Sequence, residues 1–327
     1  MQYFDDLKSS AIYAQAIAPV TLRRVKSDHD GRDLPLQIVT DMTGKEIHTS
    51  VDGSGICAHK MRYHLVQNSE VIKTAISYAD SVFSKDIINL ERGEDGIDPD
   101  RARPCLEFNG VLMRLTIFCG SFADVDGSPI LFGIQVVNSY DGSCPFSFRV
   151  YFLQLQCDNG ELYGKSDLAF FKSKHTRGVL QFKPQRADIL AAVDSAKNLP
   201  KVYADFYAGE SANKKLIESF CKNDSEKNTV INALDSPLPS ANLWQVKNAL
   251  TSWSTHGERS IPIGKKRDEH GKPLSFDRRE FEISDSVGDP LRVKENRQAR
   301  LADFFHGAVW IYQRDAAIAA TAGKESL

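Results

Sequence analysis

Three tight turns divide the centre of this chain into short β-rich segments. The turns lie at 124–129 (DVDGSP), 139–146 (SYDGSCPF) and 157–160 (CDNG), and each contains an Asp-Gly or Asn-Gly pair. Glycine after Asp or Asn readily adopts the backbone conformations that hairpin turns require. The turns therefore predict four consecutive strands joined as an antiparallel meander, at 111–119, 130–138, 147–156 and 161–171. A Rossmann or barrel pattern would instead place helices between the strands.

The strand residues alternate as a partly buried sheet requires. In the first strand, Val111 to Cys119 place apolar side chains at every second position, with Arg114 and Thr116 on the opposite face. In the third strand, Phe148 and Val150 share one face, whereas Leu153 and Leu155 lie on the other. This change predicts either a bulge near Phe152 or a strand that is covered on both sides.

Helical periodicity flanks the meander. An apolar stripe predicts a long helix over 69–83, and helical spacing returns after residue 175. The later helices are expected from Pro184 and at 211–222, 225–234, 240–253 and 291–320. The sequence therefore predicts an α+β fold, in which the four-stranded meander packs with a long helix and a helical C-terminal region.

The first 60 residues have a different pattern. Two β-rich runs, 34–39 (LPLQIV) and 45–51 (KEIHTSV), flank a short turn at Gly44, and a flexible glycine-rich segment follows at 51–56. We therefore expect an N-terminal β-hairpin arm over 1–60 and an α+β core over 61–327.

Composition excludes several classes of protein. The 327 residues carry a formal net charge of −2, with 42% hydrophobic and 26% charged residues, which is typical of globular proteins. No apolar run approaches the roughly 20 residues that span a bilayer. The first residues, MQYFDDLKSS, lack the features of a secretory signal. The sequence thus predicts a cytoplasmic protein that does not enter a membrane.

The six cysteines do not have the spacing of a metal site or redox pair. They are Cys57, Cys105, Cys119, Cys144, Cys157 and Cys221. We interpret them as structural thiols and expect no metal and no cofactor. The alternative is a hydrolase whose nucleophile is Cys57 or Cys157 beside a histidine. The histidines close to Cys57 in sequence are His48, His59 and His64.

Three stretches together resemble a known family. They are 133–161 (GIQVVNSYDGSCPFSFRVYFLQLQCDNGE), 174–179 (KHTRGV) and 243–256 (LWQVKNALTSWSTH). The chain is similar over roughly residues 60 to 310 to the phage- and plasmid-borne domain-of-unknown-function family numbered 932. One departure is Cys157-Asp158-Asn159, where the family has Ser or Thr in the middle position. The departure changes the turn chemistry more than the topology.

The resemblance carries no enzymatic activity. It implies a setting in mobile elements inside a bacterial host cell, near replication and recombination genes, so DNA is the first partner to consider. A looser, topological resemblance links the meander and long helix to Rad-fifty-two-like single-strand annealing proteins. Those proteins assemble into rings that hold DNA in a basic outer groove.

One stretch combines positive charge with aromatic residues. Its donors oppose a single acid, Asp167, and they are Lys165, Lys172, Lys174, His175, Arg177, Lys183 and Arg186. Single-strand binders combine such cations with aromatic stacking, here at Tyr163, Phe170, Phe171 and Phe182. The alternatives are that the cations form an ordinary solvated face and that Phe170 and Phe171 belong to the core.

Other candidate sites have simpler explanations. Turn chemistry alone accounts for Asp141-Gly142-Ser143, and 258–300 is expected to be a solvated hairpin or loop of mixed charge. His256 has no visible nucleophile partner in the sequence, and no catalytic motif is present.

The sequence therefore predicts a non-catalytic DNA-metabolism protein of a phage or plasmid. It would bind single-stranded DNA as an oligomer or ring, and strand annealing is a further activity that such an assembly would allow. The alternative is a protein-interaction factor that modulates a host or replication protein, for which the acidic loop 91–104 is a candidate surface.

Overall fold

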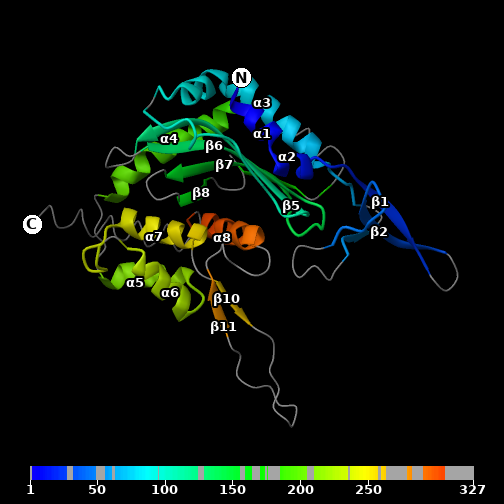
Figure 1. Cartoon of the computed structure of the whole chain (residues 1–327). Helices are drawn as coiled ribbons and strands as arrows, with labels where there is room; N and C mark the ends of the chain where they lie inside the picture. Colours follow the sequence, from blue (N-terminus) through cyan, green and yellow to red (C-terminus); the bar gives the residue numbers. More distant parts are fainter. Residues whose placement is uncertain are drawn as a thin grey trace, which may run out of the picture. The chain divides into compact units, whose positions relative to one another are not determined.

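The structure is a computed structural model in which two compact units, Met1–Val202 and Tyr203–Leu327, are described separately (Figure 1). The predicted boundary at residue 60 coincides with the end of a small sheet inside the first unit. The structure describes residues 2–27, 32–48, 56–60, 63–94, 96–123, 129–154, 159–163, 170–173, 175, 185–204, 210–234, 236–256, 259–262, 278–281 and 290–305.

A six-stranded antiparallel sheet forms the centre of the first unit. Its strands are β4 (Cys105–Phe108), β5 (Leu112–Ala123), β6 (Pro129–Ser139), β7 (Phe146–Gln154), β8 (Asn159–Tyr163) and β9 (Phe170–Ser173). The order is β4-β5-β6-β7-β8, and β9 pairs with β7 beyond the segment that pairs with β8. The antiparallel meander and the α+β fold class are confirmed. The segment predicted as the fourth strand contains parts of two strands, β8 and β9, and β4 is an addition.

The irregular position in the meander lies in β5. The register between β5 and β6 shifts between Phe118 and Gly120, whereas β7 pairs with β6 without interruption over 147–154. The predicted bulge near Phe152 is therefore wrong, and the alternative is correct, because alternate side chains of β7 are buried on both faces over 146–152. Opposite the shift lies Gly133, where a Cβ atom would lie 2.1 Å from the carbonyl oxygen of Ile117. Glycine is required there because the two backbones approach so closely.

Helix α3 (Asn68–Arg92) packs on one face of this sheet (Figure 1, cyan helix). The predicted stripe is buried or half-buried, and Tyr78 and Phe83 make edge-to-face contacts with Phe148 and Phe132. The helix is longer than predicted and kinks at Phe83, where φ is −125°. It ends at Gly93, whose left-handed φ of 67° is the usual glycine end of a helix.

The opposite face of the sheet carries a row of buried polar side chains. Arg149 donates from Nε and a terminal nitrogen to Oε1 of Gln135, at 3.1 and 2.7 Å, and Gln135 donates to Oγ1 of Thr116. Arg149 is only 1% exposed. Such a row explains the polar side chains in the period-two pattern, since each buried donor needs an acceptor.

The N-terminal region begins with helix. The elements are η1 (Gln2–Phe4), α1 (Asp5–Ser9), α2 (Ala11–Ala16), β1 (Val20–Lys26), β2 (Asp33–Asp41) and β3 (Ala58–Lys60). A hairpin is present, but β2 pairs with β1 and β3. The predicted partner run at 45–51 turns back at Gly44, where φ is 86°, and hydrogen-bonds through its backbone to Val39 and Asp41 of β2. It makes two isolated bridges, Thr40 to Glu46 and His48 to Ile56. The arm is therefore a three-stranded sheet that follows two short helices.

Helix α4 (Arg186–Ala204) leads into the second unit, which contains α5 (Glu210–Phe220), α6 (Asp224–Asn232), α7 (Leu243–His256) and α8 (Pro290–Phe305). These match the predicted helices, although 306–320 lie outside the described residues. A hairpin of β10 (Arg259–Pro262) and β11 (Arg278–Phe281) agrees with the hairpin expected within 258–300.

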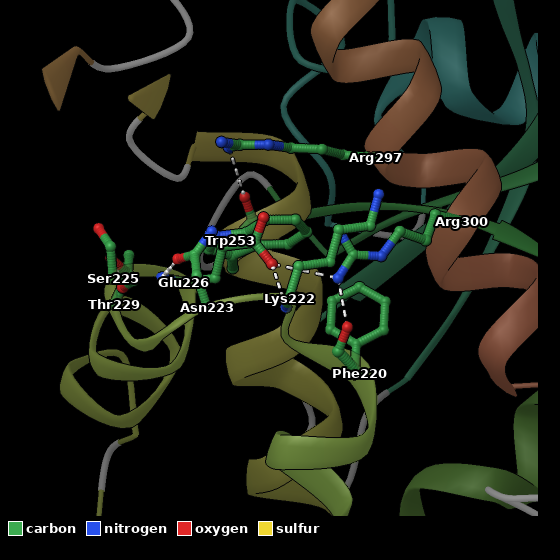
Figure 2. Close-up of polar contacts among 9 residues, drawn as sticks. All are labelled: Phe220, Lys222, Asn223, Ser225, Glu226, Thr229, Trp253, Arg297 and Arg300. Carbon is green, nitrogen blue, oxygen red and sulfur yellow. Dashed lines mark hydrogen bonds and ion pairs between the residues drawn. The ribbon is translucent and has the colours of Figure 1, made fainter. Parts of the chain in front are cut away.

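The helices of the second unit meet around Arg300 of α8 (Figure 2). Its guanidinium carbon lies 4.3 Å from the ring centre of Phe220 and 5.3 Å from that of Trp253. A terminal nitrogen donates to the carbonyl oxygen of Phe220 and pairs with Glu226 Oε2 at 3.1 Å. The guanidinium carbon of Arg297, one turn earlier in α8, lies 4.3 Å from the centre of the Trp253 ring. Arg300 thus joins the end of α5, the start of α6, and α7.

Candidate nucleic-acid interface

The basic stretch is partly described by the structure. Lys172 lies in β9, and Arg186 is the first residue of α4. Between them the structure describes His175 but not the residues directly before and after it. The other four predicted contacts, Lys165, Lys174, Arg177 and Lys183, lie outside the described residues.

Lys172 lies in a strand at the edge of the sheet. In the described part of the sheet, β9 pairs with β7 alone, and Lys172 is opposite Ser147. Phe170 and Phe171 belong to the same strand, opposite Arg149 and Phe148. The stretch therefore contributes an edge strand.

Arg186 is exposed, as a nucleic-acid contact requires. Its Nε donates to the carbonyl oxygen of Val82 at 3.2 Å, and its guanidinium carbon lies 5.8 Å from the centre of the Phe83 ring. Val82 precedes the kink of α3. Arg186 thus rests against α3 while its side chain remains in contact with solvent.

His175 is placed differently from the prediction. It is 6% exposed, and its Nε2 lies 2.8 Å from Oδ1 of Asn138 in β6. Burial lowers its pKa to about 4, with a further contribution from His59. His175 is therefore a buried neutral side chain at pH 7, and the expectation that it is a surface donor to phosphate is wrong.

The partner of His175 belongs to a buried polar network that the sequence analysis missed. Asn138 donates from Nδ2 to the carbonyl oxygen of Val66 at 3.0 Å and to Oδ1 of Asn68 at 2.7 Å. Tyr140 accepts from the backbone N–H of Asn68 through its hydroxyl. Asn138 and Asn68 are fully buried. The network joins the end of β6 to the first turn of α3.

Two stretches that carry the family resemblance meet here. Asn138 and Tyr140 belong to the first (133–161), and His175 belongs to the second (174–179). Their Asn-Ser-Tyr and Lys-His motifs were the available sequence signal, but nothing local to either motif indicated a contact between them. The third stretch forms α7 in the second unit.

An aromatic stack lies beside this network. The rings of His59 and Tyr63 stack with centroids 3.6 Å apart, and Tyr63 lies 5.2 Å from His175. His59 Nε2 donates to the carbonyl oxygen of Tyr140, while burial lowers the His59 pKa. Gly142, at φ 67°, packs against His59, since a Cβ there would lie 3.3 Å from its Cε1.

The turn at 141–143 is explained by its own hydrogen bonding, as predicted. Asp141 Oδ1 accepts from the backbone N–H of Ser143 at 2.9 Å, which is the Asx geometry of such turns. Gly142 supplies the left-handed residue. The turn also affects the two histidines electrostatically. The negative charge of Asp141 partly opposes the lowering of the His59 and His175 pKa values by burial.

The structure argues against Cys57 as a nucleophile. Cys57 is 1% exposed, and burial raises its pKa to about 12, so the reactive thiolate is scarce at neutral pH. Its backbone bridges Val39 and Ile47. Cys157 lies outside the described residues. Among the described side chains, no group of three or more His, Cys, Asp and Glu is arranged to hold a metal ion.

The acidic loop is partly neutralised by arginines. Arg103 pairs with Asp6 at 2.8 Å and with Asp100 at 2.9 Å, and Arg92 pairs with Glu94 at 3.3 Å. These exposed pairs tie the loop to the N-terminal helix and to itself, so Glu94 and Asp100 are less available to a basic partner.

Comparisons of the chain with protein-family models, curated proteins and solved structures found no match. Within the described residues, no helix is both long enough and apolar enough to cross a membrane.

Proposed function

We propose that this chain is a non-catalytic protein that binds single-stranded DNA through the stretch 165–186. Binding would combine phosphate neutralisation by the cations with stacking of bases on the interleaved aromatic rings. The cations are Lys165, Lys172, Lys174, Arg177, Lys183 and Arg186, without His175.

The observation that supports the proposal is the position of the described part of the stretch. Lys172 lies in an edge strand, and Arg186 is exposed at the start of α4. A single DNA strand could lie along this edge, because no further strand of the described sheet covers it. The proposal further includes self-association, because several copies would align their stretches along one strand and permit annealing. The family resemblance supplies the mobile-element setting.

The test is binding of a fluorescently labelled oligonucleotide to the purified chain at about 50 mM salt, followed by anisotropy. Counterion release from a single strand gives a slope of about −0.7 per neutralised phosphate in log affinity against log salt, so six cations predict a slope of about −4. Native mass measurement in parallel shows whether an oligomer forms. Absence of binding at this salt would refute the proposal.

A charge-reversal variant locates the contact. Changing Lys172, Lys174 and Arg177 together to Glu should abolish the anisotropy change. The matched control reverses Lys60, Lys73 and Lys85, which are exposed cations of the same unit, and gives the same net charge. If both variants lose affinity equally, the effect is one of overall charge. If neither does, the stretch is not the contact, and the protein-interaction alternative gains support.

A further inference from the structure

The chain is held at two successive points as it leaves the sheet. Ser173, the last residue of β9, pairs with Phe146 of β7. Two residues later, the carbonyl oxygen of His175 accepts from the backbone N–H of His64 at 3.2 Å. The His175 side chain reaches Asn138. The residues between and beyond these points include Lys174 and Arg177, two of the six proposed cations.

The attachment point for His175 is itself fixed. Asn138 uses both hydrogens of its amide on Val66 and Asn68, so its Oδ1 faces His175 as an acceptor and the imidazole donates from Nε2. All these groups are buried, and loss of one member leaves a buried polar atom unsatisfied. The hydrogen bonds of Asn138 therefore fix the position of the His175 side chain.

We propose that His175 is a positioning residue, which anchors the middle of the basic stretch to the end of β6 and so aligns the neighbouring cations for DNA. This inference rests on the proposed function of the stretch. His175 would act through Lys174 and Arg177 and would not itself touch phosphate.

The pH dependence separates anchoring from direct contact. Among the residues that the structure describes, the titratable and charged groups around His175 are His59 from β3, His64 and Tyr63 from the segment before α3, and Asp141 after β6. A surface histidine would gain charge as the pH falls through about 6.5, and affinity for DNA would rise. The pKa of His175 is near 4, so an anchor contributes no such rise between pH 8 and 6.

The experiment compares two variants of the full chain. His175→Leu removes the donor, and His175→Gln retains an N–H that can reach Asn138. The matched control is His64→Ala, which removes an exposed imidazole but keeps the backbone N–H that bonds His175. Hydrogen exchange of peptides covering 164–185 is measured on the free protein, and oligonucleotide affinity is measured from pH 8 to 6.

We expect faster exchange in 164–185 for His175→Leu alone, with near-native exchange for His175→Gln and His64→Ala. If the aligned arrangement falls to about a tenth of its population, the dissociation constant for DNA rises about tenfold. The His175→Gln variant should retain both the affinity and the wild-type pH profile. This rescue separates a specific hydrogen bond from a general loss of packing.

Three results would overturn the inference, and they are distinguishable. Unchanged exchange in His175→Leu shows that the residue is not an anchor, whether or not DNA binds. Faster exchange with unchanged affinity removes the positioning role but leaves the proposed function intact. Failure of the wild-type chain to bind DNA overturns the proposed function and, with it, the role of His175 in DNA binding.

Discussion

Removal of the Arg300 guanidinium should destabilise the helical second unit. Arg300→Met keeps most of the aliphatic stem but deletes the hydrogen bond to the carbonyl of Phe220, the ion pair with Glu226 and the contacts with two aromatic rings (Figure 2). The carbonyl is in the last turn of α5 and Glu226 is in the first turn of α6. One substitution therefore removes the contacts that Arg300 makes with three other helices.

The magnitude follows from these contacts. A hydrogen bond from a charged donor is worth about 1.5 kcal/mol, and the ring contacts contribute about 0.5 to 1 kcal/mol. The side chains of Arg300 and Glu226 are 24% and 19% exposed, so solvent screening limits the ion pair to about 0.5 kcal/mol. Since one guanidinium makes all three, the terms are not strictly additive. We expect a loss of roughly 2–3 kcal/mol.

Tryptophan fluorescence during urea unfolding measures this loss. All three tryptophans, Trp244, Trp253 and Trp310, lie in the second unit, so the signal comes from that unit alone. The control is Lys222→Met, which deletes one positive charge at an exposed side chain while the Lys222 N–H still donates to Glu226. The control should change the unfolding free energy by less than about 0.5 kcal/mol. A similarly small change for Arg300→Met would refute the reasoning.

Three further outcomes are expected. Gly133→Ala should destabilise the first unit by more than about 2 kcal/mol in urea unfolding followed by circular dichroism, because its Cβ would overlap the Ile117 carbonyl; near-native stability would contradict the close approach. A thiol reagent followed by peptide mass analysis should label exposed Cys105 in the folded chain but reach buried Cys119 only after unfolding, and equal rates would contradict this assignment. The pKa of His175 is lowered from 6.5 to about 4, so the unfolded chain binds the proton first and stability falls as the pH drops through this range. His175 should account for about 3 kcal/mol of loss in the wild type beyond any loss in His175→Gln, and parallel pH curves for the two proteins would disprove it.

Much of the fold was predictable because its signals are local. Asp-Gly and Asn-Gly turns fix where strands end, and alternation of apolar residues fixes which faces of the strands are buried. The stripe over 69–83 likewise predicted α3. The strand register was less accessible. The change of face in β7 was compatible with a bulge or with burial on both sides, and only the structure shows the second. The register shift between Phe118 and Gly120 was not predicted, because it depends on the close approach of Gly133 in the next strand to the β5 backbone.

The candidate site was predicted less completely. Charge placed Arg186 and Lys172 in one stretch, and the structure gives them an exposed helix start and an edge strand. Charge also suggested that His175 is a surface donor. Its burial depends on Asn138, 37 residues earlier, and Asn138 in turn depends on Asn68, a further 70 residues back. Contacts between residues so far apart in the chain produce no periodic pattern in the sequence, so they could not be predicted from it.

The sequence by itself determined that this chain forms an α+β protein with a central antiparallel meander and an aromatic, basic stretch after it. Turn chemistry and side-chain periodicity act between near neighbours, so they can be recognised without a structure. The tertiary structure alone decided which polar residues face solvent and which are buried. A stretch that places a histidine among lysines and arginines is typical of a protein surface. His175 is nevertheless buried, because Asn138 of β6 supplies a fixed hydrogen-bond acceptor for its imidazole where water is excluded.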